Sequence, residues 1–573
     1  MDELLTPPSL CRRPARRSVA SSLCDWAARL GTRHAFLVPG AQIGPLSDEL
    51  DRHGSLTPIV ACHELGAAYM ADGYARAGEG FGLCAAIGGP GAAYMLPAAI
   101  NARADRSAVL FLTGDVPTTM RAQGGFQDAG PTGTGDGATF FAALGQSSRL
   151  SRAEQLASRL AEVEQRLRHR RPAHLVVPWD VLRSQVAAGP PYDLPAGGED
   201  SATELATAVL EAALGESRRP VILAGAGLRH RAGAEALRRL VTVYGIPFAT
   251  TYGGKGILDE RHPLALGNFG YGGRQEAAAA LFSEEFDSLL ALGTGLGQRD
   301  TLDWDRRLRP DGRRILRIDD GEPERHAPPP YLEPDAEHQV PDVAIVLRSV
   351  ADRATRNRAQ AGWTPTTGHG GRPLPLPAPN TVGLQTIVRA LRRLAPDETV
   401  LFVDSGAHRV FAGQLWQARC DLGFYSASAI APMGWAIAAA IGAQAALPKR
   451  PVVVLTGDGC MRMHGAEIAS AVRYGLPIVY LVSNNRAYYA PRLQAGHPSA
   501  AHSIGELPEV DWASFAAVLG ARGARVDSPS AIEPEIARAL GSQQPTLIDL
   551  RTDPDEPLPQ PEMVPAWPGE PSP

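Results

Sequence analysis

The chain has 573 residues, which is enough for three or four domains with cores of their own. Its 56 basic and 61 acidic residues give a formal net charge of −5 and exclude a generally basic nucleic-acid-binding protein. Six scattered cysteines form no Cys-x-x-Cys pair, and no secretory apolar run follows the basic first residues. We therefore expect a cytoplasmic protein without a disulfide framework. An Ala-rich stretch at residues 426–447 is interpreted as a buried helix rather than a membrane span.

Two segments rich in proline and glycine, at residues 186–203 and 355–381, are typical of linkers. They predict three domains, at residues 17–187, 203–352 and 380–555. Each predicted domain has the size of a single folding unit.

Within each predicted domain, short apolar runs alternate with stretches of helical period, which is the pattern of α/β domains with parallel sheets. In chain order, the first domain has apolar runs at residues 35–40, 83–91, 108–115 and 173–180 and a helix at 64–75. The second has runs at 219–227, 246–252, 288–295 and 314–319 and a helix at 233–244. The third has runs at 399–406, 451–459, 477–485 and 545–552 and a helix at 465–474. The predicted fold is three successive doubly wound parallel-sheet domains.

The third domain contains a candidate metal site. The strand at residues 451–456 leads into Gly457-Asp458-Gly459, and the next strand ends at Asn485, 27 residues after Asp458. This spacing suffices for one βαβ crossover, which would return the second strand beside the first. Aspartate and asparagine oxygens suit magnesium, whose remaining ligands are commonly phosphate and water. The flanking glycines let the backbone approach a phosphate, and the following helix N-terminus adds donors.

A lone Gly-Asp-Gly is often an ordinary turn, but this triplet followed by a crossover and paired asparagines is far more specific. The chain here resembles the thiamine-diphosphate-dependent enzymes. The resemblance covers residues 17 to 555 and is closest to the acetolactate synthase and acetohydroxyacid synthase group. It implies a pyrimidine-binding domain, a central Rossmann-like domain and a diphosphate-binding domain.

The resemblance also implies a set of cofactor-binding residues. Asp458, Asn485 and the carbonyl of Ala487 would bind Mg²⁺. Glu64, in the run at residues 61–76, occupies the place of the glutamate that hydrogen-bonds the aminopyrimidine. Met433 would hold the cofactor bent. The remaining expected cofactor contacts are Gly89, His408, Gly457, Gly459 and Cys460.

On the substrate side, the resemblance assigns Gln127 and Arg299 to the orientation of an acceptor, and Gln42 to a weaker proton-handling role. A planar guanidinium suits a keto-acid carboxylate, although Arg299 is one of many arginines and a surface position remains an alternative. The group's lysine has no counterpart in residues 140–150. Pocket residues of the synthases are replaced by Ala490, Pro491 and Gln494. These departures argue against a housekeeping branched-chain synthase.

The middle domain holds FAD in the acetolactate synthases. Here Gly225-Ala226-Gly227, the segment 268–270 and Arg317-Ile318-Asp319-Asp320 stand at the corresponding places, but the family's pattern before Arg299 has changed. FAD is therefore possible, and a middle domain without flavin is favoured.

The predicted function is decarboxylation of a 2-keto acid followed by joining to a second carbonyl compound. The alternatives are a lyase or hydrolase of an acyloin or diketone, a catalytically silent subunit, and a flavin-dependent oxidase. The predicted partners are a 2-keto acid, a carbonyl acceptor and further copies of the chain, with no nucleic acid and no membrane. A homodimer is the expected minimum and a homotetramer the expected assembly, because the family binds its cofactor between the first domain of one subunit and the third domain of its partner.

Overall fold

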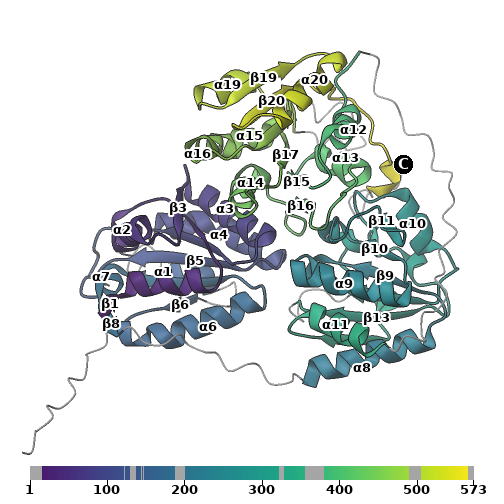
Figure 1. Ribbon diagram of the computed structural model, residues 1–573, viewed down its shortest axis with the longest axis horizontal. Coiled ribbons are helices and arrows are strands. Elements are labelled where there is room, and N and C mark those ends of the chain that lie inside the picture. The colour runs from purple at the N-terminus through teal and green to yellow at the C-terminus, as the bar shows by residue number, and fades with distance from the viewer. Residues whose placement is uncertain are drawn as a thin grey trace, which may run out of the picture.

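The computed structural model describes residues 16–121, 123–128, 137–142, 145, 147–187, 201–321, 328–354, 380–488 and 505–564. Three six-stranded sheets, each with every strand pair parallel, form three α/β domains in succession. Figure 1 shows the first domain in purple to blue, the middle domain in teal and the third domain in green to yellow, lying across the other two. The predicted fold class is confirmed.

The first domain has the strand order β3-β2-β4-β5-β7-β6, and a small antiparallel pair, β1 and β8, joins its two ends. Its central strands are buried along their whole length, as expected for a parallel sheet that helices cover on both faces. Its elements are β1 (Arg16–Ser18), α1 (Val19–Arg29), β2 (His34–Leu37), α2 (Gly44–Arg52), β3 (Thr57–Val60), α3 (Glu64–Ala77), β4 (Gly82–Ala86), α4 (Pro90–Ala104), β5 (Val109–Asp115), α5 (Gly137–Ala142), β6 (Ser147–Arg149), α6 (Leu156–Arg168), β7 (Ala173–Pro178), α7 (Trp179–Arg183) and β8 (Gln185–Ala187).

The middle domain has the strand order β11-β10-β9-β12-β13-β14. Helix α9 is capped at its C-terminus by Gly245, whose φ of +66° is a backbone conformation that favours glycine. The elements are α8 (Ser201–Glu216), β9 (Pro220–Ala224), α9 (Arg231–Tyr244), β10 (Phe248–Thr250), β11 (Ala265–Asn268), α10 (Gln275–Phe282), β12 (Ser288–Leu292), β13 (Arg314–Asp319), β14 (Ala336–Gln339) and α11 (Val343–Arg353).

The third domain has the order β16-β15-β17-β18-β20-β19 and so repeats the topology of the first. Strands β17 and β18 are neighbours, which confirms the crossover predicted from the spacing of Asp458 and Asn485. The elements are α12 (Leu384–Leu394), β15 (Val400–Val403), α13 (Ala407–Leu415), β16 (Phe424–Ser426), α14 (Trp435–Ala446), β17 (Val452–Gly457), α15 (Asp458–His464), α16 (Ile468–Arg473), β18 (Val479–Ser483), α19 (Trp512–Val518), β19 (Arg522–Val526), α20 (Pro529–Leu540) and β20 (Thr546–Leu550).

Each sheet has a point where the strand order reverses, and open α/β sheets bind ligands at the carboxyl ends of the strands there. The reversal lies between β2 and β4 in the first domain, between β9 and β12 in the middle domain, and between β15 and β17 in the third. These three positions are where ligand sites are expected.

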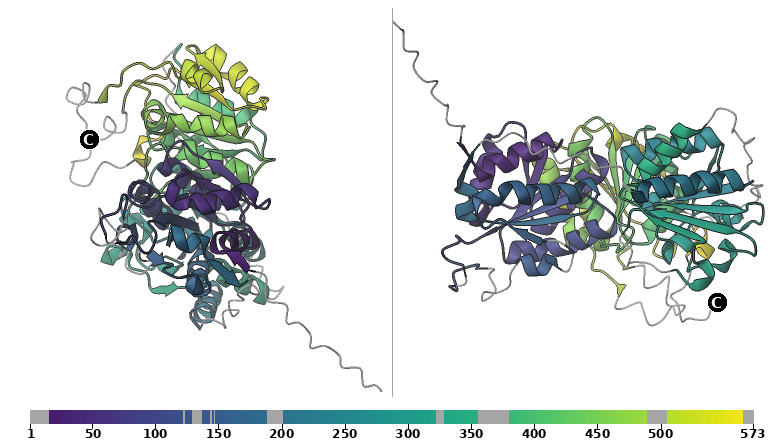
Figure 2. Two further views of the ribbon diagram at one scale, coloured as in Figure 1. Left: turned by 90° about the vertical axis from the view of Figure 1, so that its left-hand side faces the viewer. Right: turned by 90° about the horizontal axis from the view of Figure 1, so that it is seen from below.

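The first and third domains pack closely through helices α3 and α14, which lie together in the centre of the molecule (Figures 1 and 2). A Cβ atom at Gly73 would overlap the carbonyl of Ala439, and one at Gly442 would overlap the carbonyl of Met70. The two helices can therefore touch only because both positions are glycine. One hydrophobic core runs through both domains, from Phe36 to Trp435 and beyond.

A buried ionic network adds polar contacts to this junction. Arg76 pairs with Asp72 at 2.8 Å and with Asp105 at 2.9 Å, and the indole of Trp435 donates to Asp72 at 2.7 Å. None of the helices in the described part of the chain combines the length and the apolar character needed to span a bilayer.

Candidate active site

A cavity of about 310 Å³ lies at the reversal point of the third sheet, between the ends of β15 and β17. It is bounded by the first turns of α13 and α15 and by the segment after β18. The lining residues are Ser405, Gly406, Ala407, His408, Met433, Gly457, Asp458, Gly459, Cys460, Ser483, Asn485, Ala487 and Tyr488. The structure thus brings all the residues expected to bind the diphosphate and its metal to one cavity.

Asp458 has a carboxylate oxygen that is available to coordinate a metal ion. Its side chain is buried, its Oδ2 has no hydrogen-bond partner, and burial raises the pKa of its carboxyl to about 6. Asn485 and Ala487 line the same cavity, where the Ala487 N–H donates to Asn485 Oδ1 at 3.1 Å. An orphaned buried carboxylate oxygen beside amide and carbonyl oxygens fits a hard divalent cation such as Mg²⁺.

Gly459 keeps the floor of the cavity open. A Cβ atom there would lie 2.7 Å from the ring of Tyr488 and 3.1 Å from Cε of Met433. Any larger residue would push these two side chains away from the cavity. Met433 is half-buried, packs against the core shared by the first and third domains, and projects its methyl group toward Gly459.

His408 and Cys460 complete the diphosphate side. His408 is buried, its Nε2 has no partner, and burial beside Arg409 lowers its pKa to about 3, so the imidazole is neutral at physiological pH. The Cys460 thiol donates to the carbonyl of Ser405 at 3.3 Å, and burial raises its pKa well above the usual range. His408 can contact a diphosphate, whereas Cys460 is an unreactive thiol.

Glu64 is the first residue of α3 and is half-buried. The helix is capped by His63, whose Nδ1 accepts from the Leu65 N–H at 3.0 Å. The Glu64 carboxylate faces the first turn of α4, because a Cβ at Gly91 would lie 3.6 Å from its Oε1. Gly89, which immediately precedes α4, adopts a φ of +60°, which favours glycine.

The Gln42 side chain hydrogen-bonds two segments of the first domain, namely the turn before α4 and the loop expected to contact the acceptor. Its Oε1 accepts from the Gly88 N–H at 2.7 Å, and its Nε2 donates to the carbonyl of Gln127 at 3.1 Å. Both ends of the Gln42 amide are therefore engaged with the main chain. The structure brings Gln42, Gly89, Gln127 and Glu64 to the carboxyl edge of the first sheet. Phe126, beside Gln127, is 87% exposed.

Arg299 lies in a different place, a cavity at the reversal point of the middle sheet. Its guanidinium stacks on the ring of Tyr271 at 4.6 Å. Arg409 lines the same cavity, whereas its neighbour His408 lines the diphosphate cavity. The first turn of α13 therefore separates the two cavities. Ala490, Pro491 and Gln494 lie outside the described residues, and the segment 140–150 is described only in part.

Glu467, which sequence reasoning did not identify, fixes the start of the glutamate helix. Its carboxylate accepts the N–H groups of Cys62 and His63, each at 3.0 Å, immediately before Glu64. Gly66 leaves room for it, since a Cβ there would overlap Oε1. Burial raises its pKa to about 7. A carboxylate set between alanine and isoleucine in an apolar helical stretch was the available signal.

Among the described residues of one chain, the two halves of the expected site do not line the diphosphate cavity together. Every residue that lines the diphosphate cavity belongs to the third domain. Glu64, Gln42 and Gln127 belong to the first domain. A cofactor in the third domain of this chain therefore does not meet Glu64 through that cavity.

Three models of known protein families match three successive segments of the chain, one in each domain. Residues 17–131 match "Thiamine pyrophosphate enzyme, N-terminal TPP binding domain", residues 207–328 match the central domain of these enzymes, and residues 404–550 match their "C-terminal TPP binding domain". The chain belongs to the thiamine pyrophosphate enzyme family. The resemblance drawn from the sequence motifs is thereby confirmed.

Several relatives are similar over nearly the whole chain. A probable acetolactate synthase large subunit of Methanocaldococcus jannaschii is 29% identical over 93% of this chain and 91% of its own length. A putative acetolactate synthase large subunit, IlvB2, of Mycobacterium tuberculosis is 29% identical over 90% of this chain and 94% of its own. The putative thiamine pyrophosphate-containing protein YdaP of Bacillus subtilis is 27% identical over 95% and 93%. The chain is thus a thiamine-pyrophosphate-dependent enzyme of the acetolactate-synthase-like group.

Proposed function

We propose that this protein is a carboligase that decarboxylates a 2-keto acid and joins the remaining acyl unit to a second carbonyl compound. The observation that carries the proposal is the orphaned Asp458 carboxylate, which lies in one cavity with Asn485, Ala487 and His408. Full-length similarity to acetolactate synthase large subunits supports the choice of a 2-keto acid as donor.

In the proposed reaction the bond between the donor's keto carbon and its carboxylate breaks, and CO₂ leaves. A new bond then forms from the former keto carbon to the acceptor's carbonyl carbon, and the acceptor's oxygen takes a proton. Thiamine diphosphate, when bound, supplies the electron sink that decarboxylation needs. The protein's residues bind, position and exclude water.

Asp458, Asn485 and the carbonyl of Ala487 would hold Mg²⁺, which neutralises the diphosphate. The neutral His408 would donate a hydrogen bond to a diphosphate oxygen. Met433 would support the cofactor from below. Gln127 and Arg299 are proposed to orient the acceptor, and Gln42, with its amide engaged at both ends, to hold the loop that carries Gln127.

Glu64 is proposed to act on a cofactor held by a second copy of the chain. Its carboxylate would bind the aminopyrimidine ring and keep a proton on the ring nitrogen. The described part of the diphosphate cavity is lined by third-domain residues, which leaves room for a first-domain residue of a second copy and supports this arrangement across a two-fold axis. A homodimer is then the smallest active form, and we propose a homotetramer as the assembly.

The proposal is tested by incubating the purified protein with thiamine diphosphate, Mg²⁺ and a panel of 2-keto acids, and measuring released CO₂ and products by mass spectrometry. We expect CO₂ and an acyloin or acetohydroxy-acid product. Cleavage of an added acyloin or diketone without CO₂ release would replace the proposal with a lyase or hydrolase.

The variant Glu64→Gln tests the role of the glutamate. Because Gln cannot hold the proton, we expect turnover to fall by about a hundredfold or more, while the Kd for thiamine diphosphate changes little. Glu79→Gln is the matched control, since Glu79 is 73% exposed and pairs only at the surface with Arg231. Equal turnover in the two variants would remove Glu64 from the mechanism.

A further inference from the structure

A cavity of about 330 Å³ lies at the junction of the first and middle domains. From the first domain, Phe81 lines it just before β4, Ala108 just before β5 and Arg170 shortly before β7. From the middle domain, Arg229 and His230 line it at the start of α9. The strands of the first sheet thus begin at this cavity, whereas the residues expected to act on the cofactor lie where those strands end. The cavity is therefore separate from the candidate active site.

Arg229 is a buried cation in the wall of this cavity. It is 3% exposed, and its Nη1 is buried without a hydrogen-bond partner. Its guanidinium lies over the ring of Tyr425 of the third domain at 5.4 Å. Burial and the neighbouring Arg76 lower its pKa to about 10, while Asp105 acts in the opposite direction. Arg229 is thus positively charged at neutral pH and keeps a donor that an acceptor would satisfy.

The acid that attracts Arg229 is itself fully engaged. Asp105 accepts from Arg76 Nη1 at 2.9 Å, from Ser428 Oγ at 3.0 Å and from the Ala429 N–H at 3.0 Å. Asp105 therefore offsets part of the charge of Arg229 through space and still leaves Nη1 of Arg229 without an acceptor.

His230 carries a second donor beside Arg229. Its Nδ1 accepts from the Gly233 N–H at 3.3 Å, and burial beside Arg170 lowers its pKa to about 2. The imidazole is therefore neutral at physiological pH and carries its proton on Nε2. This Nε2 is buried without a hydrogen-bond partner, since Asp342 Oδ1 is 3.8 Å away. Two unpartnered donors thus belong to adjacent residues of the cavity wall.

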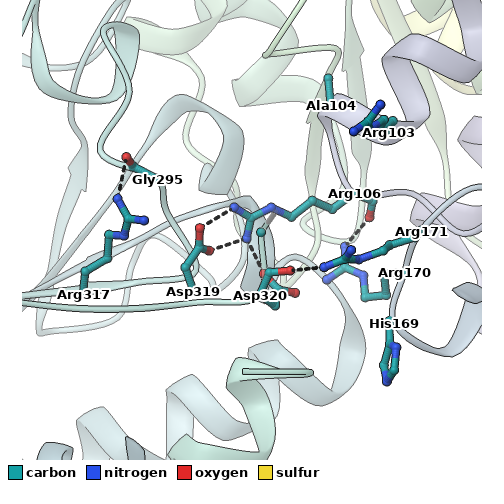
Figure 3. A pocket seen from close by; sticks show the side chains of 11 residues that line it. Arg103, Ala104, Arg106, His169, Arg170, Arg171, Gly295, Arg317, Asp319 and Asp320 are labelled. Carbon is teal, nitrogen blue, oxygen red and sulfur yellow. Dashed lines mark hydrogen bonds and ion pairs between the residues drawn. The ribbon is translucent and has the colours of Figure 1, made fainter. Parts of the chain in front are cut away.

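Two further arginines of the cavity are held by other groups. Arg106 pairs with Asp319 at 2.5 and 2.8 Å and also with Asp320, on the side of the middle domain (Figure 3). Arg170 donates to the carbonyls of Gly227 at 2.9 Å and of Arg106 at 3.0 Å. These two guanidinium groups stabilise the junction of the two domains and leave the ligand contacts to Arg229.

The acids of the cavity wall also have partners. Glu164 pairs with Arg168 at 2.6 Å, and the exposed Glu79 pairs with Arg231. Asp342 attracts Arg170. An oxyanion could therefore supply an acceptor to Arg229 without displacing any of these pairs.

The rest of the lining is largely apolar. Phe81 is 5% exposed and packs against Trp26 with the ring centroids 5.1 Å apart, and Leu167 is 6% exposed. The other apolar residues of the lining are Leu30, Ala75, Ala108 and Ala232. A guanidinium beside an apolar surface favours a carboxylate with an apolar body over a bare phosphate.

We propose that this cavity is a second ligand site, which binds a small carboxylate with an apolar body. The carboxylate accepts hydrogen bonds from Arg229 and His230, and the body packs against Phe81 and Leu167. Ala75, near the end of α3, also lines the cavity, and α3 begins at Glu64. The occupant therefore contacts the helix that carries Glu64, at the end remote from the cofactor.

The test is isothermal titration calorimetry of the full chain saturated with thiamine diphosphate and Mg²⁺. Benzoate, benzamide and inorganic phosphate are titrated in separate experiments, because benzamide keeps the ring without the charge and phosphate keeps the charge without the ring. We expect benzoate to bind at least about tenfold more tightly than either.

Two variants locate the binding. Arg229→Gln removes the charge, and Ala232→Leu fills part of the cavity while every polar group stays in place; each should weaken benzoate binding about tenfold or more. Arg231→Gln is the control, because Arg231 lies between these two residues in the chain, is 79% exposed and pairs with Glu79 outside the cavity lining.

No binding of benzoate would overturn the site. Equal affinity in the three variants would also overturn it, because benzoate would then bind elsewhere, as in the candidate active site. Equal affinity for benzamide would overturn the role of the carboxylate, and tighter binding of phosphate would overturn the apolar body. Ala232→Leu keeps the test decisive if Arg229→Gln does not fold. Because no keto acid is present, a protein that fails the carboligation assay can still pass this one.

Discussion

At the scale of single residues, the position of Glu64 depends on a second carboxylate that never enters the cofactor cavity. Glu467 holds the peptide groups of Cys62 and His63 and so sets the direction in which α3 begins. It acts from the third domain on the first domain. We infer that Glu467 is a positioning residue for Glu64.

The variant Glu467→Gln should lower kcat/KM about tenfold, because the Gln amide can accept from only one of the two N–H groups and leaves the other without its acceptor. Steady-state kinetics, with the Kd for thiamine diphosphate measured alongside, would check this. Glu556→Gln is the matched control: Glu556 also accepts two main-chain N–H groups, from Leu384 and Gln385, away from Glu64. An equal loss of activity in both variants would contradict a positioning role.

At the scale of elements, the contact between α3 and α14 joins the first and third domains through main-chain approach. Gly73 and Gly442 are required by close helix packing, and Arg76, Asp72 and Trp435 add buried polar contacts on the same face. The sequence shows these glycines only as weak points in helical stretches, because their role depends on the partner helix.

Gly73→Ala should destabilise the protein by about 1–3 kcal/mol, since the added methyl group would overlap the carbonyl of Ala439 and force the two helices apart. Urea denaturation followed by circular dichroism measures the change. Gly44→Ala is the control, because a Cβ at Gly44, the first residue of α2, meets nothing within 4 Å. Matching stabilities of the two variants would show that the helices can separate freely.

Across the whole molecule, burial shifts the pKa values of carboxyl and imidazole groups in opposite directions. Burial raises the pKa values of Glu467 and Glu556 to about 7, and it lowers those of His174 and His408 to about 3. A carboxyl whose pKa is raised by folding stabilises the protein at pH values below its pKa in the unfolded chain. This stabilisation is lost as the pH rises to its pKa in the folded protein. A histidine whose pKa is lowered by folding stabilises the protein at pH values above its pKa in the unfolded chain. This stabilisation is lost as the pH falls to its pKa in the folded protein.

The contribution of Glu467 can be isolated as the difference in unfolding free energy between the wild type and Glu467→Gln. Its pKa rises from 4.5 to about 7, so this difference should favour the wild type most below pH 4.5 and shrink by up to about 3 kcal/mol as pH rises through about 7. Urea denaturation across this pH range gives the values. A difference that stays constant with pH would show that folding leaves the pKa of Glu467 unchanged.

Local patterns in the amino-acid sequence predict the three parallel-sheet domains and the grouping of the residues expected to bind the diphosphate. Apolar runs alternating with helical stretches specify buried parallel strands, and the 27 residues between Asp458 and Asn485 permit only a short crossover. Such features are local, because they depend on spacing within one supersecondary unit. The adjacency of β17 and β18 follows from that spacing.

The contacts between the domains, by contrast, are seen in the folded chain and not in any local sequence pattern. Glu467 reaches Cys62 across 405 positions of the chain, and Arg106 reaches Asp319 across 213. No local period or spacing encodes such contacts, because they arise when separate domains pack their faces together. The same packing places Arg409 beside Arg299 while its neighbour His408 faces the diphosphate cavity. Residues that act together within one supersecondary unit can therefore be predicted from the sequence. Residues that act together across domains can be identified once the arrangement of the whole chain is known.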